Sequence, residues 1–289
     1  LTLDRAGDLT IALIVKNGQG QTAVASPAAY SIKASVVYLN AEGSDVQPYA
    51  TRESGAHSLY DALAILKDGG EVLVAPGTYG LDDRVYLKAG QSAAIRSLEG
   101  PETVTFQMVM GKSGAPFGTD NKFPMFQLSA SGARLEGVTL RGIWNGTSTG
   151  DSYLSPRAVL LEHDGAVVTN CHIHYFGGHA RKVDGAGARV EKGTLTHSTI
   201  DHCAAFGGNG ADCYGGGITQ TGGLVDHCTI LVCQMSGKPN AQPAVPGGVV
   251  AQSGGQMRNC LITGCASGSM PIVYANGTLD NCTLVANTN

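Results

Sequence analysis

The 289-residue sequence predicts an all-β solenoid, a right-handed three-sheet parallel β-helix in which short strands stack coil upon coil. Three observations support this fold class. A six-residue pattern recurs along the second half of the chain, at the intervals that solenoid coils have. Glycine, with 41 residues, is about twice as frequent as usual and marks many tight turns. A short amphipathic segment precedes the first coil, where a helix would cover the open end of the stack.

The repeated unit consists of an apolar residue, two polar or small residues, a small and mostly apolar residue, a variable residue and an aliphatic residue. Side chains alternate between the two faces of a strand, so the apolar positions point into the coil and the variable position points outward. The two polar residues mark a bend between two short strands. Successive units begin 22 to 33 residues apart, and we expect one loop in each coil to absorb this variation. The units are Leu135–Leu140, Val168–Ile173, Leu195–Ile200, Val225–Ile230, Met257–Ile262 and Leu279–Leu284.

The chain divides into three predicted parts: residues 1–34, residues 35–70 and the β-helix of residues 71–289. In the first part, the apolar run Leu9–Val15 is followed by a turn at Asn17–Gly20 and a second extended run. This pattern predicts a β-hairpin.

The second part contains the predicted capping helix. Ser58 and Asp61 have the S-x-x-D spacing of a helix N-terminus. The apolar residues at 59, 62, 63 and 66 fall on one helical face, and we expect Gly69 and Gly70 to end the helix. At the other end, Asn289 follows directly after a repeat. A stack is not expected to stop on a bare apolar face, so we expect further coils or a partner to follow.

Charge and hydropathy exclude two classes of partner. The net charge is −4 and only 15% of residues are charged, whereas a nucleic-acid-binding protein needs a basic surface to neutralise phosphates. No apolar run approaches the roughly 18 residues of a membrane-spanning helix.

All eight cysteines lie between Cys171 and Cys282, within the repeats. Two inward columns are expected, which bring cysteines of neighbouring coils close enough for disulfide bonds. Buried thiols also pack simply as small apolar groups, so free thiols and some disulfides both remain open. The columns are Cys228, Cys260 and Cys282, and Cys203, Cys233 and Cys265.

The repeats over roughly residues 70 to 289 resemble the pectate-lyase-like right-handed β-helix superfamily. The segment from Asp8 to Thr22 resembles the last strands of a PKD-type immunoglobulin-like module. The resemblance to the superfamily implies a secreted or cell-surface protein, in a bacterium, whose partner is a polysaccharide or surface glycan. In the lyases of this superfamily, carboxylates on one parallel sheet bind Ca²⁺ and an arginine or lysine abstracts a proton from a uronate. Ca²⁺ is therefore the one cofactor that the resemblance implies.

One outward patch carries the charges that such chemistry needs. The alignment places Glu162 beside Arg189 and Asp164 beside Glu191 on neighbouring coils. Arg189 and Glu162 are the catalytic candidates, and Asp164, Glu162 and Glu191 are the candidate Ca²⁺ ligands. The alternative is a surface cluster of ion pairs that contributes less than about 1 kcal/mol. The remainder of that sheet is mostly Gly, Ala, Thr and Val.

Aromatic and imidazole side chains supply two further hypotheses. Tyr153 and Tyr214 lie in loops, where their rings could stack on sugars together with Glu191 as substrate-binding residues; loop packing is the alternative. His172 and His174 point to the same side of one strand. With His179 they could chelate a metal, or they are solvent-facing side chains.

Two functions from different classes follow. The first is a β-helix that displays loops for glycan binding or adhesion at the cell surface. The second is a polysaccharide lyase or glycoside hydrolase that acts on an acidic polysaccharide through the patch of Glu162, Asp164, Arg189 and Glu191. The low charge of the sheet favours the first.

Overall fold

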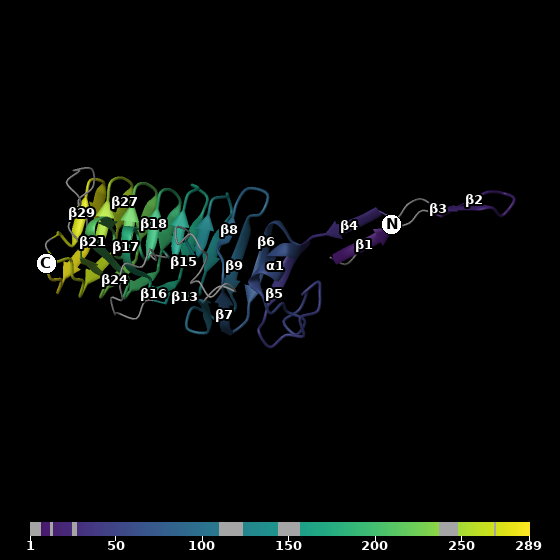
Figure 1. Ribbon diagram of the computed structural model, residues 1–289, viewed down its shortest axis with the longest axis horizontal. Coiled ribbons are helices and arrows are strands. Elements are labelled where there is room, and N and C mark those ends of the chain that lie inside the picture. Colours follow the sequence, from purple (N-terminus) through teal and green to yellow (C-terminus); the bar gives the residue numbers. More distant parts are fainter. Residues whose placement is uncertain are drawn as a thin grey trace.

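A computed structural model describes residues 7–11, 14–24, 28–109, 124–143, 157–236, 248–268 and 270–289. The chain winds into a stack of coils whose axis is the long axis of the molecule, with the N-terminal strands extending away from it (Figure 1). Strands of successive coils pair in parallel, and each coil contributes one strand to each of three sheets. The predicted right-handed three-sheet β-helix is therefore confirmed.

The three sheets have nine, eight and seven strands. The nine-stranded sheet contains β5 (Ala34–Leu39), β6 (Leu66–Val74), β9 (Ala93–Ser97), β12 (Arg134–Glu136), β15 (Val167–Thr169), β19 (Thr194–Thr196), β23 (Leu224–Asp226), β27 (Gln256–Arg258) and β30 (Thr278–Asp280). The eight-stranded sheet contains β7 (Gly77–Leu81), β10 (Val104–Met108), β13 (Thr139–Arg141), β16 (His172–His174), β20 (Thr199–Asp201), β24 (Thr229–Leu231), β28 (Leu261–Thr263) and β31 (Thr283–Val285). The seven-stranded sheet contains β8 (Val85–Leu87), β11 (Phe126–Leu128), β14 (Val159–Leu161), β18 (Ala188–Val190), β22 (Ile218–Gln220), β26 (Val250–Gln252) and β29 (Val273–Ala275).

Three of the coils have an additional strand, which follows the strand of the eight-stranded sheet and precedes that of the seven-stranded sheet. These additional strands pair into a smaller parallel sheet. It consists of β17 (Gly177–Asp184), β21 (Ala204–Tyr214) and β25 (Gln234–Ser236).

The bend that the repeat predicts between the nine- and eight-stranded sheets has a left-handed backbone in six coils. Asparagine, glycine and histidine fill this position, and asparagine and glycine tolerate positive φ better than most residues. His197 and His227 are turn residues of this kind, with φ values of 47° and 49°. The six residues are Gly137, Asn170, His197, His227, Asn259 and Asn281.

The interior of the coils is apolar and closely packed. Phe106, Phe126 and Phe176 are fully buried, as the inward positions of the repeat require. The described cysteine side chains are free thiols, and all but that of Cys282 are buried. Burial raises the pKa of Cys171 to about 12, so this thiol packs as a small apolar group and is a poor nucleophile.

The N-terminal end is covered as predicted, with one difference in detail. The helix α1 (Leu59–Ile65) has Ser58 as its N-cap. The side chain of Ser58 accepts a hydrogen bond from the backbone N–H of Tyr60 at 3.2 Å. It ends at Ile65, before the two glycines, because β6 already begins at Leu66 and pairs with β5. The coil stack therefore begins with β5 and β6, ahead of the start expected at residue 71.

Two antiparallel pairs precede the stack, and they confirm the predicted hairpin. The strand β1 (Gly7–Ile11) pairs with β4 (Ala28–Ile32), and β2 (Ile14–Lys16) pairs with β3 (Thr22–Val24). The side chains of Ile14, Val15 and Val24 are more than half exposed. The likeness to a PKD-type module stays a prediction. Within the described residues, no helix is long and apolar enough to span a bilayer.

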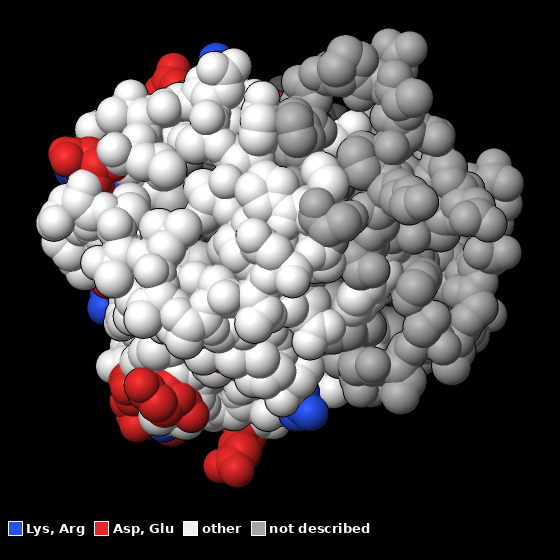
Figure 2. All heavy atoms as spheres, turned by 90° about the vertical axis from the view of Figure 1, so that its left-hand side faces the viewer, with Lys and Arg blue, Asp and Glu red and all other residues white. Residues whose placement is uncertain are grey.

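The C-terminal coil presents its interior edge to solvent. Figure 2 shows a broad face with few charges at its centre and acidic side chains near its rim. Leu284 and Val285 are about half exposed, and a hollow of about 430 Å³ lies between them and Pro271–Val273. The expectation that further coils or a partner cover this face stays a prediction.

One polar contact between coils makes stability depend on pH. Asp226 accepts hydrogen bonds from Arg258 Nη2 at 3.1 Å and from Asn259 Nδ2 at 2.9 Å. The bond from Arg258 lowers the pKa of Asp226 to about 2. A lowered carboxyl pKa stabilises the fold above the unfolded-state value of about 3.9, and this stabilisation is lost as the pH falls towards 2.

We therefore expect the melting temperature of the native chain to fall faster than that of Asp226→Asn as the pH is lowered from about 4 to about 2. Thermal denaturation followed by circular dichroism across this range measures the difference. Parallel curves for the two proteins would contradict the role of Asp226.

Candidate functional site

The outward face of the seven-stranded sheet forms a ladder with one residue from each coil. The strands stack about 4.8 Å apart, and the pairing aligns Tyr86, Gln127, Leu160, Arg189, Thr219, Ala251 and Tyr274. Thr219 and Ala251 are buried, whereas Tyr86 is 37% exposed and Gln127 is partly exposed. Arg189 and Tyr274 are partly exposed as well, but Tyr86 and Gln127 are neighbours, on β8 and β11 near the capped end of the stack.

The register of the predicted charged patch differs from the expectation by two residues. Arg189 pairs with Leu160, not with Glu162. Glu162 lies level with Glu191, since each residue directly follows its strand. The backbone N–H of Glu162 bonds to the carbonyl of residue 128, and that of Glu191 bonds to the carbonyl of residue 161, each in the preceding coil. Asp164 lies in an exposed turn. The turn after β14 spans residues 162–166 whereas the turn after β18 spans only 191–193, so length also varies in this turn.

Arg189 is held between two carboxylates. Its Nη1 contacts Asp184 Oδ2, and its Nε donates to Glu191 Oε1 at 2.7 Å. Asp184, at the end of β17, is only 8% exposed. These two contacts fix the guanidinium in place.

Glu162 belongs to a polar chain that crosses three coils. Its Oε2 accepts hydrogen bonds from Gln127 Nε2 at 2.7 Å and from the hydroxyl of Ser129. Arg84 Nη1 donates in turn to Gln127 Oε1 at 2.7 Å. Glu162 is therefore engaged in orienting its neighbours on the sheet face.

Arg157 stands just before β14 and adds a second guanidinium to the group. Burial lowers its pKa to about 10, and the charge of Arg189 acts in the same direction, while Glu191 and Glu162 oppose it. Sequence reasoning missed Arg157 because it precedes the strand whose outward positions were compared.

The described carboxylates on this face do not gather into a calcium cage. Among the residues that the structure describes, three His, Cys, Asp or Glu ligand atoms lie within 4.8 Å of one another at only one place, formed by His172, His174 and Asp201. That place is on the eight-stranded sheet. Glu162, Asp164 and Glu191 are not brought together in this way, and their role as Ca²⁺ ligands stays a prediction.

Of the two tyrosines predicted to bind sugar, the structure describes Tyr214. Tyr214 is the last residue of β21 and not, as expected, a loop residue. It is aligned with Asp184 of β17 and partly exposed, so it lies close to the Arg189 contact. Tyr153 lies outside the described residues.

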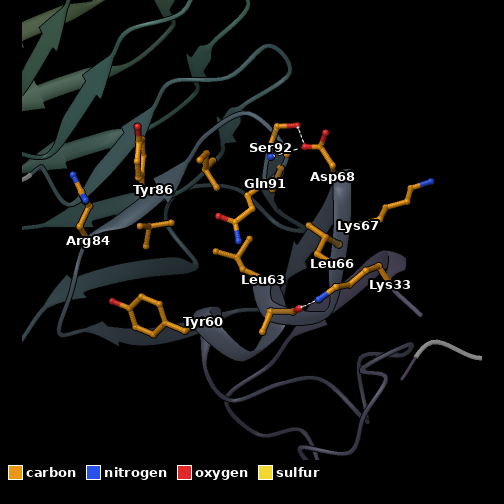
Figure 3. Close-up of a pocket in the computed structure, with 15 residues that line it drawn as sticks. Lys33, Tyr60, Leu63, Leu66, Lys67, Asp68, Arg84, Tyr86, Gln91 and Ser92 are labelled. Atoms are coloured by element: carbon orange, nitrogen blue, oxygen red, sulfur yellow. Dashed lines mark hydrogen bonds between the residues drawn. The ribbon is translucent and has the colours of Figure 1, made fainter. Parts of the chain in front are cut away.

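A pocket of about 460 Å³ opens beside the capped end of the ladder (Figure 3). Tyr60 of α1 and Tyr86 of β8 lie on one side, together with Arg84 just before β8, and Lys33 and Lys67 lie on the other. Its volume falls in the range of small-ligand sites, about 300–1,000 Å³.

The charges around the pocket are mainly positive. Lys33, Lys67 and Arg84 face a single described acid in the lining, Asp68. The carboxylate of Asp68 accepts hydrogen bonds from the backbone N–H and hydroxyl of Ser92, at 2.7 and 2.8 Å. These bonds lower the pKa of Asp68, so it stays ionised and fixed, and the pocket keeps an excess of cations.

Tyr86 forms the wall between the pocket and the sheet. The guanidinium carbon of Arg84 lies 4.7 Å from its ring centroid, and Lys88 Nζ lies 5.7 Å from it. Sequence reasoning missed Arg84 and Tyr86 because both precede Leu135, where the first recognised repeat begins. The signal was present, since Val85-Tyr86-Leu87 has the same inward–outward–inward pattern as Phe126-Gln127-Leu128.

Comparison with known proteins supports the fold. Residues 157–289 match the family described as the right handed beta helix region. No curated protein matches the sequence significantly. The family match and the strand order confirm the predicted right-handed parallel β-helix.

Three pectin methylesterases are among the solved structures that resemble this chain. The enzyme from carrot is 12% identical, with a TM-score of 0.44 over 86% of this chain and 82% of that one. The Aspergillus niger enzyme is 13% identical, with a TM-score of 0.43 over 88% and 87%. A pectin methylesterase in complex with a hexasaccharide is 13% identical, with a TM-score of 0.45 over 82% and 71%.

Proposed function

We propose that this chain is a secreted or cell-surface module that binds an acidic polysaccharide without cleaving it. The bound saccharide occupies the pocket beside Tyr86 and continues along the outward face of β8 and β11. The observation that carries the proposal is the continuity of a cationic, tyrosine-lined pocket with a polar sheet face.

The chemistry of the pocket suits a uronate. Tyr86 offers an aromatic face and Tyr60 a second ring at the pocket wall, and amphipathic rings of this kind pack against the apolar faces of ligands while their hydroxyls stay wet. Lys33, Lys67 and Arg84 supply positive charge for a carboxylate. Gln127 and Glu162 follow on the adjoining coils as hydrogen-bonding groups for sugar hydroxyls.

Binding without cleavage follows from how the catalytic candidates are engaged. Arg189 is paired with both Asp184 and Glu191, and a guanidinium in that position is a poor base. Glu162 accepts two hydrogen bonds from neutral side chains, so its Oε2 is already held by its neighbours on the sheet face.

The proposal predicts that binding depends on Arg84 and Tyr86. Isothermal titration calorimetry with polyuronate oligosaccharides should detect binding that neutral gluco-oligosaccharides do not show. Arg84→Ala and Tyr86→Ala should each weaken it on the order of ten-fold, equivalent to about 1.4 kcal/mol. Added salt should weaken it as well, because part of the affinity is electrostatic.

Arg52→Ala is the matched control. Arg52 is an exposed arginine that pairs with Glu99 at 3.3 Å and does not line the pocket. This variant should bind as the native chain does. Equal affinities of all three variants for the polyuronate would contradict the proposed site.

A polysaccharide lyase is the second candidate, and Arg157 is the observation that favours it. A guanidinium whose pKa is lowered to about 10 is closer to a proton-abstracting base than an ordinary arginine is. The ultraviolet absorbance of unsaturated uronate products, followed with and without Ca²⁺, separates the two functions. A rise that Arg157→Ala abolishes would replace the binding proposal with the lyase.

A further inference from the structure

Two histidines and an aspartate come together on the eight-stranded sheet, away from the proposed saccharide site. The strands β16 and β20 pair so that His172 is opposite Thr199 and His174 is opposite Asp201. Ile173 and Ile200 fill the inward positions and are fully buried. Alternation along each strand therefore places His172, His174 and Asp201 on the outward face.

The ligand atoms of these three side chains all lie within 4.8 Å of one another. His172 Nε2 is 2.5 Å from Asp201 Oδ2, and His174 Nδ1 is 4.0 Å from Asp201 Oδ1. The two imidazole centroids are 4.5 Å apart. Tetrahedral zinc, with bonds of 2.0–2.1 Å, needs ligand atoms about 3.4 Å apart. Shifts of well under 2 Å, achieved by side-chain rotation, would bring all three atoms to that spacing.

The ligand atoms of the group are imidazole nitrogens and a carboxylate oxygen, which transition-metal ions accept. His174 Nε2 is buried without a hydrogen-bond partner.

The surroundings orient the carboxylate. His202 Nδ1 lies 2.9 Å from Asp201 Oδ1, so Asp201 faces three imidazoles. The ring of Tyr175 lies between the rings of His174 and His202, with centroid distances of 4.8 and 5.3 Å. Arg141 pairs with His174 on the next coil and its charge disfavours a cation. Its side chain is exposed, where solvent and salt screen that effect.

We propose that His172, His174 and Asp201 form a binding site for a divalent transition-metal ion of the zinc class, with His202 holding Asp201 in position. Two imidazoles and one carboxylate suit zinc, iron or cobalt, whereas calcium and magnesium take oxygen ligands. Three protein ligands leave at least one coordination position open to water or a further ligand. His179, the third ligand suggested by the sequence, has a side chain outside the described residues, and Asp201 takes its place.

Metal binding is tested with zinc alone on the untagged full chain after treatment with a chelator. Isothermal titration calorimetry near neutral pH should show one zinc ion per chain. Asp201→Asn and His172→Gln should each weaken binding at least about ten-fold, since even groups that only support a ligand contribute 10–100-fold. Both substitutions keep the shape of the side chain approximately, and circular dichroism checks that the variants are folded.

His227→Gln is the matched control. His227 Nδ1 lies 2.9 Å from Asp226 Oδ1 and its ring stacks on His197 at 4.9 Å, but it belongs to no group of three ligands among the described residues. This variant should bind zinc as the native chain does. Cobalt should give visible absorption without a thiolate charge-transfer band. Absence of stoichiometric zinc binding, equal affinities of all variants, or a thiolate band would each overturn the proposal.

Discussion

Replacing Phe126 with alanine should lower the free energy of unfolding by about 3–5 kcal/mol, the range measured for large buried aromatic residues. Phe126 lies on β11 and is fully buried. Its ring meets that of Phe106 edge-on at 5.4 Å, and Phe106 in turn contacts Tyr79 at 5.7 Å. Truncation removes one end of a row of rings that joins the eight- and seven-stranded sheets across two neighbouring coils, and stacked coils cannot collapse easily to fill the cavity. Chemical denaturation measures the loss.

Tyr86→Ala provides the comparison. Tyr86 lies on β8, the strand that pairs with β11, where it is opposite Gln127 and faces outward. A surface substitution there should change stability by no more than about 0.5 kcal/mol, although the same variant should weaken saccharide binding. The two aromatic residues therefore separate folding from function. A loss for Phe126→Ala no greater than for Tyr86→Ala would contradict the assigned inward and outward faces.

Gly223→Ala should also destabilise the fold severely. Gly223 has a φ of +62°, and an added Cβ would lie 2.5 Å from the carbonyl oxygen of Gly193 in the preceding coil. Positive φ alone costs a non-glycine residue about 1–2 kcal/mol, and the backbone contact forces the coils apart in addition. We expect a total loss of several kcal/mol, visible as a large drop in melting temperature.

Gly132→Ala isolates the contribution of the contact. Gly132 has a φ of +79°, but a Cβ there would meet nothing within 4 Å. This variant should show only the conformational cost. Equal losses for the two substitutions would show that the close approach of the coils at Gly223 has no energetic consequence.

The sequence was sufficient to predict the coil stack because the inward positions repeat with the same polarity in every coil. The same periodicity could not determine which residue of β14 lies beside Arg189. A shift of two residues keeps every side chain on the same face, and the turn after β18 is shorter than the turn after β14 by that amount. Glu162 and Arg189 therefore appeared paired in the sequence, although Leu160 is the true neighbour of Arg189.

The histidine group could have been predicted from the repeat. The units beginning at Val168 and Leu195 already align His174 with Asp201 on neighbouring strands. The pocket was harder to foresee, since it depends on how α1 and Lys33 pack beside β8. Its residues come from segments before the first recognised repeat, and no periodic pattern connects them. Likewise, Asp184 reaches Arg189 only because β17 leads directly into the turn before β18.

The central claim is that this β-helix holds an acidic saccharide at the pocket beside Tyr86 and leaves it intact. A crystal structure of the chain soaked with a polyuronate oligosaccharide tests it most directly. The expected result is an uncleaved saccharide whose carboxylate lies among Arg84, Lys33 and Lys67, with a sugar ring packed against Tyr86. A saccharide bound elsewhere on the coils, or an unsaturated product in its place, would contradict the account.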